Sequence, residues 1–254
     1  MTIGMLGCGN MGGAIASALV QEGKDTVLAF DHTRAKVEGS GAGYATLEEL
    51  LSRSDLVVIA IKPQGVPALY PTLRQASPSE GWISIAAGIT LGTLKEQLGT
   101  KKVVRFMPNI AAKVKKSVTA VCADTDCPSS LKEKAFSIAT SFGSACSLDE
   151  SLLPAFTGIS GSGIAYVFQF MHAMALGGTR MGIPYPKSVE VVRDTMESAI
   201  ALARATGKNP IDLMMGVCSA GGTTIEGVAA LERNQFDNAV IEAVTDSANK
   251  SKKM

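Results

Sequence analysis

The sequence predicts two domains, an α/β domain with a doubly wound, mostly parallel sheet and an all-α domain after it. Short apolar runs typical of strands alternate with helical patterns through the first half of the chain. This alternation is typical of a parallel sheet whose strands are buried by helices on both faces. Strand signals stop after about residue 150, and only helical patterns follow. The 254 residues are enough for two domains, which we place at 1–150 and 151–254.

The expected elements of the first domain follow from these patterns. The expected strands are Ile3–Leu6, Val27–Phe30, Leu56–Ile61, Ile83–Ala86 and Val103–Met107. The expected helices between them are Met11–Gln21, Leu47–Ser52, Val66–Arg74 and Leu91–Leu98. Two further runs, Val118–Ala123 and Ala145–Leu148, flank a helical stretch at Ser129–Thr140 and are expected to extend the sheet at one edge. In the second domain, the expected helices are 163–179, 187–206, 210–215, 222–233 and 236–250.

Charge and cysteine content exclude several classes of function. The net charge of +1 gives no basic excess for a nucleic acid or an anionic membrane. The five cysteines include no C-x-x-C pair, so neither a disulfide framework nor a metal site is expected. The longest apolar stretch, Ile164–Gly178, contains Gln169 and His172 and is too short and too polar to span a bilayer. We therefore expect a cytoplasmic protein.

The helical domain carries a signal for self-association. The helix at 163–179 is apolar on nearly all sides, and such a helix is normally buried all round. In a domain of this size, the simplest burial is against a second subunit. We predict a homodimer joined through the helical domain, or a larger homo-oligomer built from it.

A glycine motif opens the first helix. The run Gly7-Cys8-Gly9-Asn10-Met11-Gly12 has the G-x-G-x-x-G pattern. It follows the first expected strand and opens the first expected helix, which is where this pattern binds dinucleotides. Gly7 permits the tight turn, Gly9 lets a pyrophosphate approach the backbone, and Gly12 allows close packing of helix on strand. The phosphates would lie at the helix N-terminus near Asn10 and Met11. This predicts a Rossmann domain that binds a dinucleotide; the alternative is a tight turn that binds nothing.

The end of the second strand gives conflicting signals about the cofactor. Asp31 lies roughly 20 residues beyond the motif, where an acidic residue usually bonds the ribose hydroxyls of NAD. Thr33 and Arg34 follow closely, and an arginine there could bind the 2′-phosphate of NADP. The expected cofactor is therefore NAD or NADP.

Several motifs together resemble the pyrroline-5-carboxylate reductases over nearly the whole chain. Besides the glycine run, they are Ile61-Lys62-Pro63-Gln64, Ser84-Ile85-Ala86-Ala87-Gly88, Arg105-Phe106-Met107-Pro108-Asn109, Ser160-Gly161-Ser162-Gly163 with Ala165-Tyr166, and Gly221-Gly222-Thr223-Thr224. The resemblance implies a Rossmann domain followed by a helical dimerisation domain. It also implies hydride transfer from NADPH or NADH to the imine carbon of 1-pyrroline-5-carboxylate, which gives L-proline.

The resemblance implies a substrate site at the start of a helix. By analogy with the family, Ser219, Gly222, Thr223 and Thr224 bind the small substrate, and Thr224 lies near the imine nitrogen and could relay the proton. Glycines and threonines at a helix start expose several N–H groups together, which suits a carboxylate. The alternative is a threonine that only caps the helix.

Further candidates lie where strands are expected to end, the usual place for ligands of such sheets. Lys62 and Pro63 could contact the ribose or nicotinamide end of the cofactor, and Asn109 could bond its carboxamide. The alternatives are a surface lysine and a turn asparagine. Glu150 at the domain junction could shape the site or be a surface charge.

The chain departs from the family pattern at three places where the family usually has proline or a Thr-Pro pair: Ile110-Ala111, Ile164 and Ala220. These departures could lower activity or change the preferred imine. Reduction of another cyclic imine or a keto acid, and a nucleotide-binding regulatory protein without turnover, remain alternatives. The β-hydroxyacid dehydrogenases use a lysine on a helix of their second domain, and no lysine occurs between Leu152 and Met181.

Overall fold

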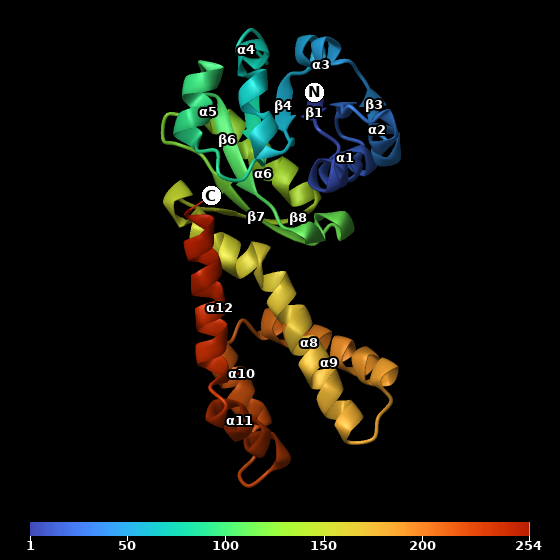
Figure 1. Cartoon of the computed structure of the whole chain (residues 1–254), viewed down its shortest axis with the longest axis vertical. Coiled ribbons are helices and arrows are strands. Elements are labelled where there is room, and N and C mark those ends of the chain that lie inside the picture. Colours follow the sequence, from blue (N-terminus) through green and yellow to red (C-terminus); the bar gives the residue numbers. More distant parts are fainter. Residues whose placement is uncertain (254) are drawn as a thin grey trace. The chain divides into compact units, whose positions relative to one another are not determined.

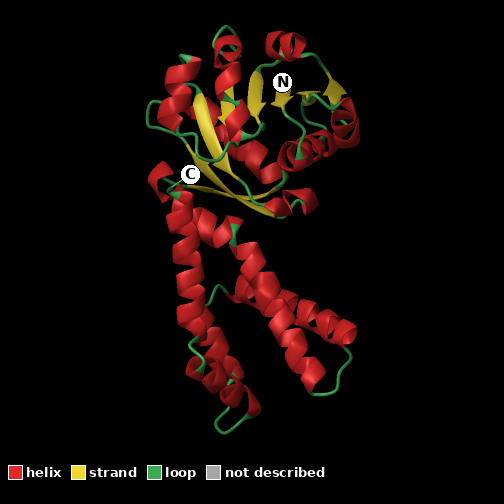
Figure 2. Ribbon diagram, viewed as in Figure 1, coloured by secondary structure: helices red, strands yellow, loops and turns green. Residues whose placement is uncertain are grey.

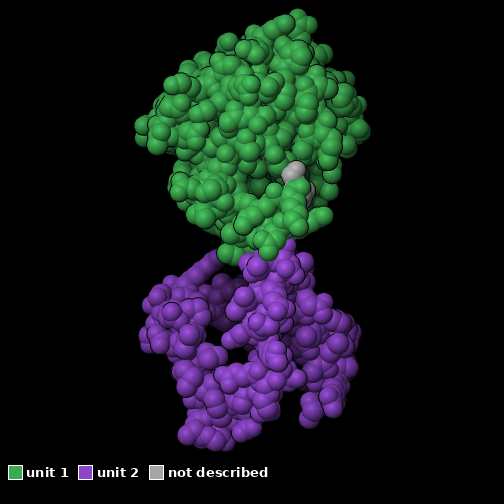
Figure 3. Space-filling view, turned by 60° about the vertical axis from the view of Figure 1, so that its left-hand side comes forward, with its two compact units in different colours: residues 1–161, 247–254 green, residues 162–246 purple. Residues whose placement is uncertain are grey.

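The computed structural model describes residues 1–253 and divides into two compact units (Figure 1). Unit 1 is Met1–Gly161 together with the end of the chain from Ser247, and unit 2 is Ser162–Asp246 (Figure 3). The domain boundary predicted after residue 150 lies ahead of this division and stays a prediction.

Unit 1 contains one sheet of eight strands in the order β3-β2-β1-β4-β5-β6-β7-β8 (Figure 2). The strands are β1 (Thr2–Leu6), β2 (Thr26–Phe30), β3 (Gly43–Tyr44), β4 (Leu56–Ile59), β5 (Gly81–Ser84), β6 (Val103–Met107), β7 (Ser117–Cys122) and β8 (Gly143–Ser147). All neighbours are parallel except β6 and β7. The predicted fold class is confirmed, and β7 and β8 extend the sheet at one edge as expected.

The sheet is buried on both faces by two separate groups of apolar side chains. Along β4, Leu56 and Val58 belong to one group, and Val57 and Ile59 belong to the other. Because successive side chains of a strand point to opposite faces, a strand buried on both sides must be apolar at every position. This is why β4 reads as a continuous apolar run in the sequence.

The helices and turns of unit 1 connect these strands. They are α1 (Asn10–Glu22), α2 (Arg34–Ser40), α3 (Leu47–Arg53), η1 (Pro63–Gly65), η2 (Pro67–Leu69), α4 (Tyr70–Leu73), α5 (Leu91–Leu98), η3 (Ile110–Val114), α6 (Ser129–Ser141), η4 (Glu150–Leu152), α7 (Leu153–Phe156) and the π-helical turn η5 (Thr157–Gly161). The prediction of one helix at Val66–Arg74 is wrong. Pro67 and Pro71 divide it into η2 and α4, because proline lacks the N–H that a continuous helix needs.

Unit 2 is a set of helices with very little buried core of its own. The helices are α8 (Gly163–Arg180), α9 (Tyr185–Thr206), α10 (Pro210–Val217), α11 (Thr223–Arg233) and α12 (Phe236–Ser251), close to the predicted ranges. Within Ser162–Asp246 only Ala175, Ser188 and Val192 are buried. The side chain of Phe168 on α8 is 63% exposed, so the burial expected for this helix is not provided by the single chain.

Among the described residues, one stretch passes the test of length and composition for crossing a membrane, although the run Ile164–Gly178 within it was predicted to be too short and too polar. It is Glu150–Arg180, with a mean hydropathy of 1.3 in its most apolar window, of which 17% is buried. This stretch is not one regular helix, since it consists of η4, α7, a π-helical turn and α8.

Candidate active site

The glycine loop after β1 is tightly packed against the protein at Gly12 and has free space beside it at Gly9. Gly7 has a φ of +105°, a left-handed conformation that favours glycine. A Cβ atom on Gly12 would collide with the carbonyl oxygen of Gly7. Gly9 is the N-cap of α1 and would have no atom within 4 Å of an added Cβ. No side chain caps α1, so the N–H groups of its first turn, including those of Asn10 and Met11, are available to an anion.

The loop therefore fits a dinucleotide by its shape and by its donors. The empty space at Gly9 matches the predicted approach of a pyrophosphate to the backbone, and the tight contact at Gly12 matches the predicted packing of helix on strand. An open hollow of about 210 Å³ adjoins the loop between α1, α2 and η3. Lys36 and Lys113 border this hollow, so its charge also suits a phosphate.

Asp31 joins the glycine loop to the end of β2. Its Oδ2 accepts the backbone N–H of Cys8 at 2.9 Å, and its Oδ1 accepts that of Thr33 at 2.9 Å. The Lys36 ammonium lies 3.6 Å from Oδ1. Burial works to raise the pKa of Asp31, but the two backbone donors and Lys36 outweigh it and lower this pKa. Lys36 was not among the predicted site residues, because the short polar helix α2 that carries it was not predicted. The predicted bond from Asp31 to a ribose hydroxyl stays a prediction.

Arg34 is engaged within the protein. Its Nε donates to Glu38 at 2.9 Å, and its guanidinium lies 4.9 Å from the centre of the Tyr44 ring. Both contacts are at the surface, where ion pairs contribute little free energy. A phosphate could therefore displace them, and the predicted contact to a 2′-phosphate stays a prediction.

Lys62 and Pro63 lie just beyond the carboxyl end of β4. Pro63 begins η1, and Lys62 is the exposed residue before it. Among the described residues, the Lys62 ammonium has no hydrogen-bond or ion-pair partner. It is therefore free to meet a ligand at this edge of the sheet, as predicted for a doubly wound fold.

Asn109 is buried, and its side-chain amide makes hydrogen bonds to other residues of unit 1. Its Oδ1 accepts the backbone N–H of Ala111 at 3.2 Å, and its Nδ2 donates to Ser160 Oγ at 3.0 Å. A bond from this amide to a nicotinamide carboxamide would compete with these contacts, and it stays a prediction. Ser160 was not predicted as the partner of Asn109, because it lies 51 residues further along the chain.

The predicted substrate residues lie in unit 2, in the turn before α11. Gly222 donates its backbone N–H to Ser219 O at 3.0 Å, and Gly221 between them has a φ of +67°. Gly222 is the N-cap of α11, and no side chain caps this helix. Thr223 and Thr224 are its first two residues, with first-turn N–H groups available to an anion. The structure thus brings the substrate candidates together in unit 2 and the cofactor candidates together in unit 1.

Two thiols near these elements are expected to be unreactive. Burial raises the pKa of Cys8 to about 11 and that of Cys122 to about 12. Because the thiolate is the reactive form, very little of Cys8 is reactive near neutral pH. We expect iodoacetamide to modify the exposed Cys146 well before Cys8 and Cys122 in the folded protein, and all of them alike in denaturant, as measured by peptide mass spectrometry. Early labelling of Cys8 would show that the glycine loop opens.

Comparison with known proteins identifies the family. A model described as pyrroline-5-carboxylate reductase dimerisation matches residues 150–254, and one described as NADP oxidoreductase, coenzyme F420-dependent, matches residues 2–88. Pyrroline-5-carboxylate reductase of Aquifex aeolicus is 33% identical over 100% of this chain and 97% of its own length. The chain belongs to the pyrroline-5-carboxylate reductase family. Pyrroline-5-carboxylate reductase of Escherichia coli is 32% identical over 99% of this chain and 97% of its own length.

Solved structures of the pyrroline-5-carboxylate reductase family share the whole fold. The enzyme of Streptococcus pyogenes superposes with a TM-score of 0.86 at 30% identity, over 100% of this chain and 99% of its own. The enzyme of Plasmodium falciparum, with NADP bound, gives 0.86 at 26% identity, over 100% of this chain and 97% of its own. The predictions of an NAD(P)-dependent oxidoreductase and of a Rossmann domain followed by helices are confirmed. An imine reductase of Streptomyces aurantiacus, at 16% identity and a TM-score of 0.57, shares the fold alone.

Proposed function

We propose that this chain catalyses the reaction for which its family is named, the reduction of 1-pyrroline-5-carboxylate to L-proline with NADPH or NADH, in proline synthesis. A hydride is added to the imine carbon and a proton to the ring nitrogen. The observation that carries the proposal is the start of α11, where no side chain caps the first-turn N–H groups and Thr224 is the second residue of the helix. A small imine with a carboxylate needs these two features together.

The bound nicotinamide supplies the hydride. The work of unit 1 is to hold the dinucleotide, through the loop Gly7-Cys8-Gly9-Asn10-Met11-Gly12 and the residues that follow β2 and β4. The free ammonium of Lys62 adds a positive charge at the edge of the sheet where ligands of doubly wound folds bind. No strong acid or nucleophile is needed, because an iminium accepts hydride readily, and orientation of the reactants is the main requirement.

The work of unit 2 is to hold the substrate. We infer that the first-turn N–H groups of α11 bind the substrate carboxylate, helped by the helix dipole. Ser219 and Gly222 shape the turn that leaves these donors uncapped. The hydroxyl of Thr224 can both accept and donate a hydrogen bond, so it can pass a proton to the ring nitrogen.

Substitution of Thr224 tests this assignment. We expect Thr224→Ala to lower kcat by about a hundredfold, within the range that a positioned proton donor contributes. The oxidation of NADPH or NADH with 1-pyrroline-5-carboxylate is followed by the loss of nicotinamide absorbance, and cofactor Kd is measured separately by fluorescence. The matched control, Thr224→Ser, keeps the hydroxyl and should retain most of the rate.

Two results would count against the proposal. A Thr224→Ala variant with the full kcat would remove Thr224 from the mechanism. Absence of turnover by the unmodified protein with either cofactor, despite tight dinucleotide binding, would exclude this reaction and leave other imines to be tested.

We also propose a cytoplasmic homodimer joined through unit 2, as the unit of larger homo-oligomers. The family model that covers this half of the chain is a dimerisation model. Large apolar side chains on α8, α9, α10 and α12 are exposed in the single chain, and a monomeric soluble protein rarely exposes so much apolar surface. A second copy would cover them, which also accounts for the apolar stretch at Glu150–Arg180 without a membrane.

A further inference from the structure

The segment Glu150–Gly161 is the part of unit 1 that leads into α8, and its two ends are bonded to β6 and to the residues just after β6. It consists of η4, α7 and the π-helical turn η5. Its first residue contacts Arg105, which lies within β6, and its end contacts Asn109, which lies just after β6. We call these two contacts the Glu150 contact and the Ser160 contact.

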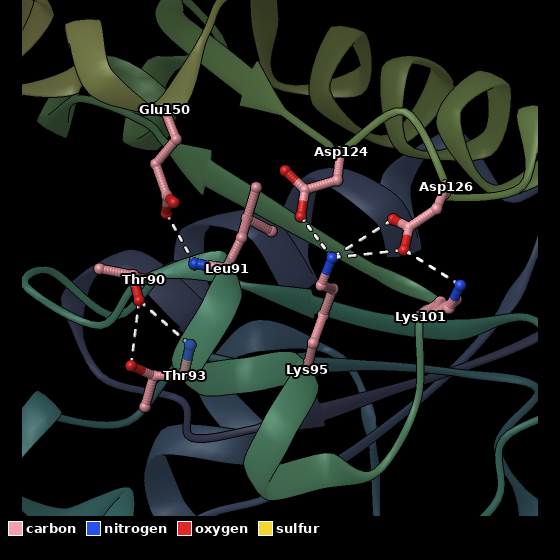
Figure 4. Close-up of polar contacts among 8 residues, drawn as sticks. All are labelled: Thr90, Leu91, Thr93, Lys95, Lys101, Asp124, Asp126 and Glu150. Atoms are coloured by element: carbon pink, nitrogen blue, oxygen red, sulfur yellow. Dashed lines mark hydrogen bonds and ion pairs between the residues drawn. The ribbon is translucent and has the colours of Figure 1, made fainter.

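The Glu150 contact joins a buried arginine to a partly exposed glutamate at the start of a helix. Glu150 Oε1 accepts Arg105 Nη1 at 2.7 Å and the backbone N–H of Leu91 at 2.7 Å. Figure 4 shows the carboxylate pointing to this N–H at the first turn of α5. The Arg105 side chain is only 7% exposed, and its Nε has no hydrogen-bond partner among the described residues. Glu150 is therefore the one acidic partner of this buried charge in the part of the chain that the structure describes.

The Ser160 contact is part of a buried polar network. Asn109 Nδ2 donates to Ser160 Oγ at 3.0 Å, and Ser160 Oγ donates to Val118 O on β7 at 3.3 Å. The backbone N–H of Asn109 donates to Ser117 Oγ at 3.1 Å. Asn109, Ser117 and Ser160 are all buried, so each bond is costly to lose and the geometry is well defined. The network fixes the π-helical turn, a feature that often marks functional sites.

We propose that Arg105 and Asn109 are positioning residues of the reductase reaction: through Glu150 and Ser160 they hold both ends of the Glu150–Gly161 segment at the carboxyl end of β6. The proposal rests on the proposed reductase function and adds to it. Ligands of doubly wound sheets bind at the carboxyl ends of the strands, so the segment is held beside the edge where the nicotinamide is expected. A displacement of about 1 Å between reactants can cost a hundredfold in rate.

This assignment differs from a direct role of Asn109 on the cofactor. Both atoms of its amide already have partners within unit 1, and one of them is on the segment itself. If Asn109 acts through Ser160, removal of either side chain must lower kcat and leave cofactor binding unchanged. If Asn109 binds the carboxamide, removal of Asn109 alone must weaken cofactor binding.

The test compares Asn109→Ala, Ser160→Ala, the double variant and Glu150→Gln in the full chain. We expect each to keep the Kd for NADPH within about twofold of the unmodified protein and to lower kcat by about tenfold or more. The loss of kcat in the double variant should be smaller than the product of the two single losses, because both substitutions remove the same Asn109–Ser160 side-chain contact. With cofactor deuterated at the transferred position, the isotope effect on kcat should increase, because hydride transfer becomes slower than product release. Glu150→Asp, which keeps the charge, should recover part of the rate.

Several outcomes would overturn the proposal. A raised Kd for NADPH in Asn109→Ala but not in Ser160→Ala would show direct contact with the cofactor. An unchanged kcat with a lowered Tm would show that the contacts only stabilise the fold. If the unmodified protein shows no turnover, the proposed reaction fails, but the positions of the two contacts can still be tested by hydrogen exchange of backbone amides.

Ser160→Ala should speed amide exchange at Thr157–Gly161, and Glu150→Gln should speed it at Glu150–Leu152. Unchanged exchange in both variants would overturn the proposal that these contacts hold the segment. Ser160→Ala removes one hydroxyl and keeps the test usable if Asn109→Ala fails to fold.

Discussion

Replacement of Gly9 by alanine is expected to weaken cofactor binding strongly and leave the protein folded. The backbone of Gly9 has φ −66° and ψ −168°, an extended conformation that any residue adopts, and an added Cβ would meet no atom within 4 Å. The methyl group therefore costs the free protein nothing. It would, however, stand on the outer side of the glycine loop, where the pyrophosphate must approach the backbone closely.

The expected loss of cofactor affinity is large, because a pyrophosphate held away from the loop loses several backbone N–H donors at once. We expect the Kd for NADPH to rise by about a hundredfold or more in a fluorescence titration, which corresponds to about 2.7 kcal/mol, while Tm stays unchanged. Gly216→Ala is the matched control, because its Cβ would also meet no atom within 4 Å but lies in α10 of unit 2. It should leave the Kd unchanged. An unchanged Kd in Gly9→Ala would mean that the dinucleotide does not use this loop.

Substitution of Gly12 should differ from that of Gly9 in its effect on the stability of the free protein. An added Cβ there collides with the carbonyl oxygen of Gly7, which is backbone and cannot move aside cheaply. Gly12→Ala is therefore expected to lower the stability of the free protein as well as cofactor binding. The two glycines of one motif thus have different physical roles, one in binding and one in packing.

These local features are the part of the molecule that the sequence could predict. Continuous apolar runs such as β4 report burial on both faces of a sheet directly, and the glycine loop is contained within six consecutive residues. Helix boundaries in unit 2 were also predictable, since prolines and glycines mark them. The short helix α2 and the two-residue strand β3 were missed, because neither is long enough to show a period.

Partners that are far apart in the chain could not be predicted in this way. Asn109 bonds a serine 51 residues later, and Arg105 bonds a glutamate 45 residues later. A period or a motif reports how buried a residue is, but it does not report which polar group will face it. An arginine within the apolar run of β6 was a usable signal, since a buried charge needs an acidic partner. It did not identify Glu150 as that partner.

The second large effect concerns assembly. We expect Phe168→Glu to dissociate the proposed homodimer and to lower Tm by about 10 °C or more, as measured by light scattering and thermal unfolding. Phe168 lies on α8 and is 63% exposed in the single chain. Glutamate is a better helix former than phenylalanine, so the single chain alone predicts no loss of stability from this change. A buried, unpaired carboxylate in a dimer interface predicts a large loss.

Val114→Glu is the matched control for this test. Val114 is a similarly exposed apolar residue at 68%, but it lies in η3 of unit 1. The same change of an exposed apolar side chain to a carboxylate should leave the oligomeric state as it is. A Phe168→Glu variant that stays dimeric would place the interface elsewhere, whereas a stable, active monomer would show that unit 2 needs no partner. The second result would be unexpected, because unit 2 buries only Ala175, Ser188 and Val192 within itself, and helices without a core are stabilised by what packs against them.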